Sequence, residues 1–361
     1  MNRREWVLRS FRDEYAEKVP AGFWFHFVQD ELEDGFANPR VFEKNLAGHR
    51  AYYGEFQPDF MKIMTDGFFI YPNTELRNAR NAGDLLKVVS IGEDHPWIEK
   101  QIEFAKAVTG IFGGEVLSFY NIFAPATTFK FMRRDPLRDG DAELAAFITE
   151  DRDAVKHALA VTAEDLAVLA RRVILEGGAD GIYFSTQDIN GQGMTRDIHD
   201  GIIAPGDTLV LEAANAAAVD AVHAEAAVNA AAAGGPGGGD PARTGPLNIL
   251  HICGYEGHRN DLGRFVSYPA QIFNWASAIE GVPLGEGKRL FGKPVIGGFA
   301  NTADGILCRG SESDVKAETR RILEEAGRKG VVLGADCTIP RDTDLRRLDW
   351  VREAASSPFF V

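Results

Sequence analysis

Three residues of this chain combine the side-chain types and the spacing of a metal site. His251 and Cys253 lie two residues apart in the segment 247–254, which begins as an apolar run typical of a buried strand. Because strand side chains alternate between two faces, residues two apart point to the same side. Cys337 ends a second apolar run, residues 330–337. The pattern therefore predicts one imidazole and two thiols directed at a common site.

This set of ligands has a preferred metal. Two thiolates and an imidazole favour Zn²⁺ over harder cations. Three protein ligands leave one position of a tetrahedral zinc open to substrate, as in catalytic rather than structural sites. The alternative is that both cysteines are buried apolar side chains and that His251 is a core histidine with satisfied hydrogen bonds. Cys308, in the polar segment 306–310, is expected to take no part.

The elements that would position these ligands are short apolar strands that alternate with helices. Helical spacing predicts helices over residues 3–17, 40–56, 96–109, 142–176 and 313–326, the last with Ser313 as N-cap. Strands are predicted over residues 22–28, 58–66, 115–120, 180–185, 247–254, 271–274, 294–298 and 330–335. This alternation predicts a (β/α)₈ barrel, with a doubly wound open sheet as the alternative. A barrel would gather all strand ends, and hence the three ligands, at one mouth.

We expect residues 1–361 to form a single barrel domain with an insertion over residues 213–245. The insertion is first rich in alanine, which predicts a continued helix, and then rich in glycine and proline, which predicts a flexible surface loop. A tolerated loop without function is one interpretation of the glycine-rich part. A flap that contacts a partner is the other.

Composition excludes several function classes. The formal net charge of −14 argues against a nucleic-acid partner, because phosphate binding needs clustered Lys and Arg. There is no run of about 18 apolar residues, so no membrane span is expected. The charged start is unlike a signal peptide, and three cysteines are too few for a disulfide framework. We therefore expect a cytoplasmic protein with reduced thiols.

With these residues in view, the chain resembles the uroporphyrinogen decarboxylase superfamily over nearly its full length. The motifs that carry the resemblance are Arg3-Arg-Glu-Trp-Val7, Phe123-Ala-Pro125, Gly178-Ala-Asp-Gly-Ile182, His251-Ile-Cys-Gly254 and Leu333-Gly-Ala-Asp-Cys-Thr-Ile-Pro340. The resemblance implies a distorted (β/α)₈ barrel with an N-terminal helical extension, in agreement with the alternation of strands and helices.

Within that superfamily the residues depart from the decarboxylases. Those enzymes bind a polycarboxylate porphyrinogen with arginines after the first strand, but no arginine occurs here between Arg12 and Arg40. The position of the decarboxylase tyrosine holds Phe131, and the decarboxylase histidine near the last strand gives way to Cys337. The decarboxylase aspartate is matched by Asp66.

The pattern is more similar to the corrinoid-dependent methyltransferases, whose His-x-Cys…Cys motif binds zinc. This resemblance implies methyl transfer between the cobalamin of a separate corrinoid protein and a small thiol, methoxylated or hydroxyl substrate held at zinc. Two alternatives stay open. The first is a uroporphyrinogen decarboxylase that needs no metal, and the second is a non-catalytic barrel that binds a corrinoid or a porphyrin.

Further residues at the predicted strand ends are candidates for the barrel mouth. The catalytic candidates are His26, Asp66 and Asp188. The substrate-binding candidates are Asn190, Asn274, Trp275 and Asn301. Gly297 and Gly298 are small enough to leave room for the face of a corrinoid cofactor. His258, just past the His-x-Cys motif, could orient a ligand or could lie in a solvated loop.

Overall fold

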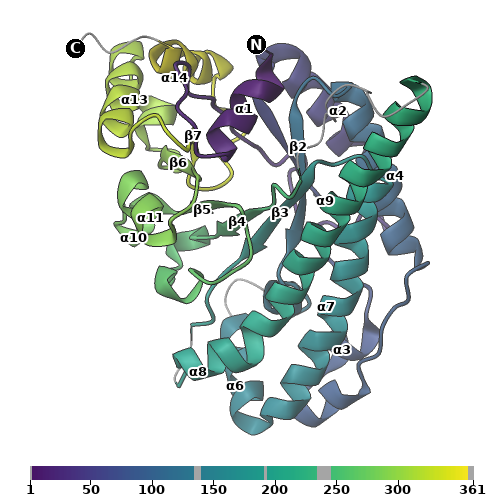
Figure 1. The fold of residues 1–361 in the computed structure, drawn as a ribbon. Helices are drawn as coiled ribbons and strands as arrows, with labels where there is room; N and C mark the ends of the chain where they lie inside the picture. The colour runs from purple at the N-terminus through teal and green to yellow at the C-terminus, as the bar shows by residue number, and fades with distance from the viewer. Residues whose placement is uncertain (1, 134–139, 191–192, 234–244, 357–361) are drawn as a thin grey trace.

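Seven parallel strands form one curled sheet with the helices outside it (Figure 1). The computed structural model describes residues 2–133, 140–190, 193–233 and 245–356. The strands follow one another in chain order and are β1 (Phe60–Ile63), β2 (Leu117–Phe123), β3 (Gly181–Thr186), β4 (Ile249–Ile252), β5 (Ile272–Trp275), β6 (Val295–Phe299) and β7 (Val331–Ala335). Because every neighbouring pair is parallel, all strands end at the same edge. The predicted α/β architecture with a parallel sheet is confirmed.

The first predicted strand, residues 22–28, is wrong as a strand. The chain runs beside β7 only at Ala21, which forms an isolated parallel bridge with Leu333. On the other side the amide of Asp59, just before β1, donates to the carbonyl of Ala21 at 3.4 Å. Beyond this point the chain leaves the ladder, because the carbonyl of Trp24 accepts from the amide of Ile339 instead. An extended segment with one bridge therefore lies between β7 and β1.

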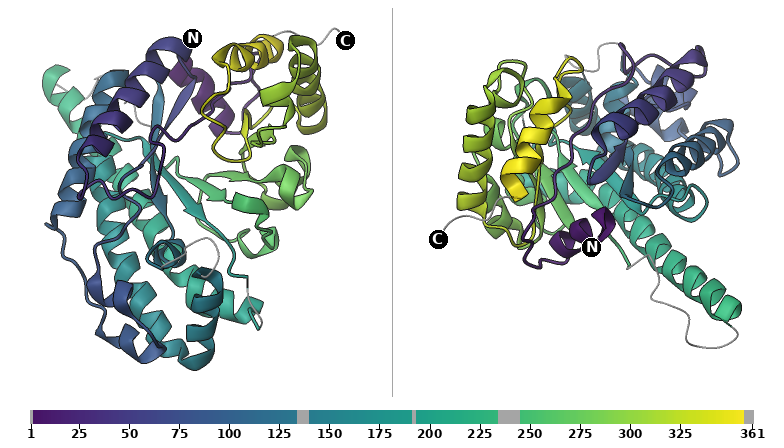
Figure 2. Two further views of the ribbon diagram at one scale, coloured as in Figure 1. Left: turned by 180° about the vertical axis from the view of Figure 1, so that it is seen from behind. Right: turned by 90° about the horizontal axis from the view of Figure 1, so that it is seen from above.

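The helices connect the strands along the outside of the sheet (Figure 2). The longer ones are α1 (Arg3–Phe11), α2 (Arg40–Phe56), α4 (Pro96–Phe112), α6 (Gly140–Glu150), α7 (Arg152–Leu175), α9 (Ala204–Ala233), α11 (Leu284–Phe291), α13 (Glu312–Ala326) and α14 (Leu345–Ser356). The shorter ones are α3 (Thr74–Asn78), α5 (Pro125–Phe131), α8 (Arg196–Ile198), α10 (Ser277–Glu280) and α12 (Ile306–Arg309). Short 3-10 or π-helical segments are η1 (Ala82–Lys87), η2 (His199–Ile203), η3 (Tyr255–Gly257) and η4 (Leu262–Arg264).

Helix bounds differ from the predictions where a cap intervenes. The predicted helix 40–56 is confirmed as α2. The predicted helix 142–176 is two helices, because Asp151 caps α7 by accepting from the amides two and three residues on. The N-cap of α13 is Ser311 rather than Ser313, since Ser311 and Asp314 form a capping box.

Inward-facing side chains fill the curled sheet at the end where the strands begin. This inner core contains Trp24, Phe60, Leu117, Phe119, Tyr183, Ile249, Ile272, Ile296 and Val332. Helix α1 packs Val7, Leu8 and Phe11 against it. The guanidinium of Arg4 also pairs with Asp180, which directly precedes β3. One end of the sheet is therefore closed by α1, and the end where the strands finish is left for a site.

Helix α9 accounts for the first part of the predicted insertion. Its residues Ala214, Ala217, Ala218 and Ala221 are buried, and the helix packs against α7 (Figure 1). The stretch Arg196–Asn229 is long and apolar enough to cross a membrane by composition, with mean hydropathy 1.3, but half of that window is buried in the fold. Small alanines packed against α7 explain this apolarity. Residues 234–244 of the predicted insertion lie outside the described residues.

Candidate metal centre

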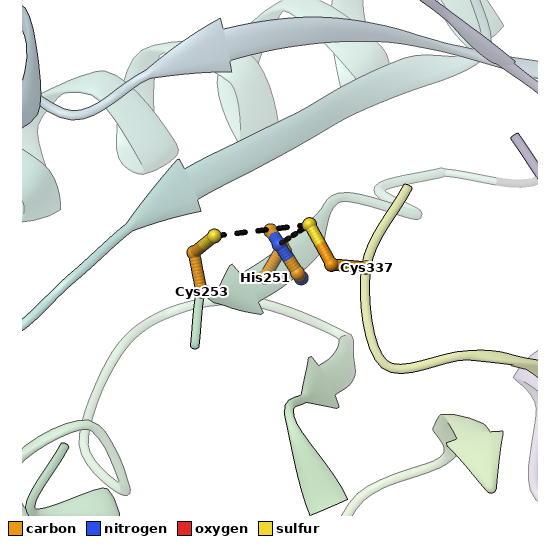
Figure 3. Close-up of side chains that lie close together, drawn as sticks. All are labelled: His251, Cys253 and Cys337. Carbon is orange, nitrogen blue, oxygen red and sulfur yellow. Dashed lines mark hydrogen bonds between the residues drawn. The ribbon is translucent and has the colours of Figure 1, made fainter. Parts of the chain in front are cut away.

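The three predicted ligands meet where β4 and β7 end (Figure 3). The Sγ atoms of Cys253 and Cys337 are 3.8 Å apart, and Sγ of Cys337 lies 3.4 Å from Nε2 of His251. All three ligand atoms lie within 4.8 Å of one another. His251 is buried and both cysteines are partly buried. The topology thus brings together residues that are 84 to 86 positions apart in the chain.

These distances fit a tetrahedral zinc. With Zn–S of about 2.3 Å and Zn–N of about 2.0–2.1 Å, tetrahedral angles separate two sulfurs by about 3.8 Å and a sulfur and a nitrogen by about 3.6 Å. The observed 3.8 and 3.4 Å agree with both values. A disulfide would need about 2.05 Å between the sulfurs. The three residues can therefore hold a metal ion with one position left for another ligand.

Asn274 on β5 fixes the orientation of His251. Its Oδ1 accepts from Nδ1 of His251, and the hydroxyl of Tyr183 donates to the same oxygen at 3.0 Å. Its Nδ2 donates to the carbonyls of Ile296 and Ala335, so the amide cannot be reversed. Because Nδ1 carries the proton, Nε2 is left with a free lone pair directed at the cysteines.

The loop that carries Cys253 is held by close packing. The amide of Cys253 donates to the carbonyl of Thr186 at the end of β3, at 2.8 Å. A Cβ on Gly254 would lie 2.3 Å from Cβ of Ala276, just before α10. Glycine is therefore required next to Cys253, since any side chain would displace the ligand. Close packing against Ala276 therefore explains the glycine of the His-x-Cys-Gly motif.

The second cysteine is anchored through its neighbour. The carboxylate of Asp336 accepts from Oγ of Ser277 at 2.6 Å and from the amide of Ala278 at 2.8 Å. These bonds tie the end of β7 to the first turn of α10. The backbone next to Cys337 is therefore fixed relative to α10.

The two thiols differ in acidity without a metal. The pKa of Cys337 lies well below that of an ordinary thiol, because Cys253 donates a hydrogen bond to it and His251 and Lys62 lie near, although burial opposes the shift. The pKa of Cys253 is raised, because it donates that bond and because its thiol is largely removed from water. Cys337 is therefore the first of the two to become a thiolate.

A cavity of about 440 Å³ opens from the three ligands. One wall is aromatic: the ring centroids of Phe69 and Phe131 are 5.4 Å apart in a stacked arrangement, and Phe123 meets Phe69 edge-on at 4.6 Å. This wall can pack against an apolar organic group next to the metal position. The size is that of a pocket for a small molecule.

Another part of the cavity wall is polar. The ammonium of Lys130 donates to Asp141 at 2.8 Å and to Oε1 of Gln187 at 2.9 Å. Nε2 of His258 donates to the carbonyl of Asp188 at 2.8 Å, and its pKa is lowered by burial and by Lys130. His258 therefore lines the cavity as a neutral, held side chain rather than lying in a solvated loop.

Two of the predicted mouth residues line the cavity, and a third acts through one of them. His26 and Asn301 are part of its wall. Asp66 is buried behind His26: its Oδ1 accepts from Nδ1 of His26 at 2.8 Å, and its Oδ2 accepts from the amide of Phe27 at 2.7 Å. Asp66 thus orients His26 and closes the loop after the extended segment. Asn274 likewise lies behind His251 rather than in the wall.

The remaining predicted residues are placed elsewhere. Asp188 is buried in an ion pair with Arg264, at 2.7 Å. Asn190 is exposed and is not among the residues that line the cavity, although its Nδ2 contacts His258 and its amide donates to Oδ2 of Asp141 at 3.4 Å. Both follow β3, as predicted, but the chain turns before their side chains can enter the cavity.

Trp275 and the two glycines face the helices. The buried ring of Trp275 packs against Phe291 of α11, and its Nε1 donates to the carbonyl of Val282. A Cβ on Gly298 would lie 2.9 Å from Ile322 of α13, and one on Gly297 would lie 3.4 Å from Leu284. Gly298 thus allows close packing of α13 behind β6, whereas a Cβ at Gly297 would make an ordinary contact, and neither glycine is among the residues that line the cavity.

Lys62 on β1 is a cavity residue that the sequence interpretation missed. It lies in an apolar strand between Met61 and Ile63, and only 5% of it is exposed. The signal was available, because a lysine within a strand buried on both faces needs a specific partner.

Comparison with known proteins identifies solved structures with a similar fold and the family of the chain. It is similar to a structure described as a methyltransferase from Methanosarcina mazei, with a TM-score of 0.65, 15% identity and 98% of each chain covered. It is also similar to a B12-independent methionine synthase from Shewanella sp. W3-18-1 in complex with selenomethionine, with a TM-score of 0.50, 11% identity and 94% of each chain covered. At these identities the likeness concerns the fold. A search of curated proteins found no match. The family described as uroporphyrinogen decarboxylase (URO-D) matches residues 74–357, so the chain belongs to this family.

Proposed function

We propose that this protein is a zinc-dependent methyltransferase. It would move a methyl group between a corrinoid protein and a small thiol, methoxylated or hydroxyl substrate. The observation that carries the proposal is the arrangement of His251, Cys253 and Cys337, which fits tetrahedral zinc with one position facing a cavity. The fold shared with a methyltransferase from Methanosarcina mazei supports the class.

The residues around the site have complementary tasks. A bound zinc would supply Lewis-acid chemistry that lowers the pKa of a coordinated thiol or hydroxyl. Asn274 keeps His251 in the tautomer that can ligate. The wall of Phe69, Phe123 and Phe131 would hold the organic part of the substrate and exclude water from the reacting atoms.

The cavity is poorly suited to a porphyrinogen with many carboxylates. Of the three lysine and arginine side chains among the described residues that line it, only Lys62 is left for a substrate anion, and one charge cannot balance several carboxylates, while Lys130 is paired with Asp141. Arg341 donates to the carbonyls of Val28 and Gln29, so its charge holds a loop. Phe131 has no hydroxyl where the decarboxylase tyrosine would be. These features favour methyl transfer over the decarboxylase alternative.

Zinc content is the decisive first measurement. We expect about one tightly bound zinc per chain in protein purified from zinc-supplemented medium, and loss of that zinc in His251→Ala and Cys253→Ser. Cys308→Ser is the matched control, because the Cys308 thiol contacts Thr343 and lies outside the cluster, so its zinc content should be unchanged.

Methyl transfer is then measured directly. Methylcobalamin is mixed with the zinc-loaded protein and a small thiol, and loss of the methylcobalamin absorption spectrum reports transfer. We expect turnover that disappears in His251→Ala and persists in Cys308→Ser. A zinc-free protein that decarboxylates uroporphyrinogen, or one that binds cobalamin without turnover, would contradict the proposal and favour the corresponding alternative.

A further inference from the structure

Lys62 is a buried cation directed at the floor of the cavity. On β1 the side chains of Phe60 and Lys62 point to the inside of the curled sheet, and Phe60 belongs to the inner core. Lys62 pairs in register with Phe119 on β2, one layer closer to the strand ends than Phe60. It therefore lies between the inner core and the three ligands, in the wall of the same cavity.

Lys62 has no hydrogen-bond acceptor and no ion-pair partner among the residues that the structure describes. Its Nζ lies 4.2 Å from the ring centroid of Tyr183 and 5.3 Å from that of Trp24. These aromatic faces favour a cation only weakly compared with the cost of removing an ammonium from water. An unsatisfied donor beside a cavity indicates that the ligand supplies the acceptor.

The metal ligands cannot fully serve as that partner once zinc is present. Without metal, burial lowers the pKa of Lys62 to about 8, and the negative charges of Cys337 and Cys253 oppose this shift. Zinc with two thiolates and a neutral imidazole has no net charge. A ligand with one negative charge at the open position would instead give a neutral site together with Lys62.

We propose that Lys62 is an anion-binding residue that recognises the charged heteroatom of the substrate, a thiolate, alkoxide or phenolate next to the three ligands. This inference rests on the proposed methyl transfer. When the methyl–heteroatom bond breaks, the methyl carbon bonds to the electron pair of a Co(I) corrinoid and the bonding pair remains on the heteroatom. Lys62 thus binds the demethylated anion more strongly than the neutral methylated compound, and stabilises the charge as it develops.

A pair of probes that differ only by the methyl group tests this inference. Thiophenol, as its thiolate, and its neutral methyl derivative thioanisole are titrated into zinc-loaded wild type, Lys62→Met and Lys62→Arg by calorimetry. For Lys62→Met we expect thiophenolate to bind about 10- to 100-fold more weakly, the effect of losing one charged hydrogen bond, and thioanisole to bind as before. Lys62→Arg retains a cation and should keep the preference for the anion.

Folding and metal content are measured on the same samples. Because methionine replaces an unpaired buried cation, Lys62→Met should unfold at the same temperature as wild type or higher. In a folded, zinc-containing Lys62→Met protein, the affinities for thiophenolate and thioanisole could fall by the same factor, or neither could fall. Either result would overturn the inference and leave the proposed function standing. Absence of zinc from wild type would overturn both.

Discussion

Asn274 determines which nitrogen of His251 faces the cysteines. It is fully buried, and its Nδ2 donates to two backbone carbonyls, so its Oδ1 is fixed as the acceptor for Nδ1 of His251. Such partners behind a ligating histidine raise metal affinity as well as fix geometry. The geometry of the site therefore depends on Asn274 as well as on the ligand His251.

Replacing Asn274 by alanine should weaken zinc binding without removing a ligand. We expect the affinity to fall about 10- to 100-fold, because both tautomers and ring orientations of His251 become accessible. Competition with a chromophoric chelator measures this change. Affinity within twofold of wild type would show that the cysteines and backbone alone orient His251.

Among single residues, the sequence predicts those whose chemistry and spacing are distinctive. His251, Cys253 and Cys337 are predictable because two thiols and an imidazole at strand ends are characteristic of a metal site. Asp188 and Trp275 are predicted at the mouth because they follow strands, but an ion pair with Arg264 and packing on Phe291 turn them away. Those contacts join distant segments and are invisible in local spacing.

Among the elements, the turn after β4 carries Cys253 and packs against Ala276 at the start of α10. A Cβ on Gly254 would overlap that of Ala276, so Gly254→Ala must move the turn that carries Cys253. We expect a loss of about 1–3 kcal/mol in the free energy of unfolding together with weaker zinc binding. Denaturant unfolding and chelator competition measure the two effects.

Gly110→Ala is the matched control for that substitution. Gly110 lies within α4, and no heavy atom outside its own helix lies within 4 Å of the added Cβ. Alanine there should stabilise the protein slightly, by about 0.4–1 kcal/mol, and leave zinc binding unchanged. Equal behaviour of the two variants would contradict the close-packing argument for Gly254.

Helix α9 carries a buried carboxylic acid that makes stability depend on pH. Asp207 accepts from Tyr268 at 3.0 Å and from Thr186 at 3.2 Å, and burial raises its pKa to about 7. In the unfolded chain its pKa is about 3.9. Between about pH 4 and 7 the folded protein therefore keeps a proton that the unfolded chain has lost, and this contribution to stability falls as pH rises.

Asp207→Asn should remove this dependence. Relative to wild type, we expect the variant to gain on the order of 2–4 kcal/mol in the free energy of unfolding between pH 4.5 and pH 8. Urea unfolding of both proteins at the two pH values gives the difference directly. A difference that does not change with pH would mean that Asp207 ionises at its ordinary pKa.

The strands were more predictable than the caps and the first segment. Seven of the predicted strands correspond to β1 to β7, because short apolar runs between helices favour buried strands. Residues 22–28 have the same composition, yet the carbonyl of Trp24 is used by Ile339 in the loop after β7. The boundary within 142–176 depended on a single capping residue, Asp151.

For the molecule as a whole, α1 packs on the end of the sheet where the strands begin, far from the three ligands at the end where the strands finish. We expect packing at the first end to affect stability and not metal binding. Phe11 of α1 is buried in the inner core, with its ring centroid 5.8 Å from that of Phe119. We expect Phe11→Ala to cost about 3–5 kcal/mol in the free energy of unfolding while the folded protein keeps its zinc. Denaturant unfolding and metal analysis check this, and loss of zinc from the folded variant would contradict this expectation.

The single bridge between Ala21 and Leu333 leaves the curled sheet only weakly closed between β7 and β1, and we call this gap the seam. Because one bridge holds the extended segment to β7, the amide protons at the seam should exchange with solvent earlier than those of β3 and β4. Cys337 follows β7 on one side of the seam, and Lys62 lies in β1 on the other side. His251 lies on β4, in the middle of the sheet. Metal bound by Cys337 and His251 would link the loop after β7 to β4, so loading the site should slow amide exchange at the end of β7 first.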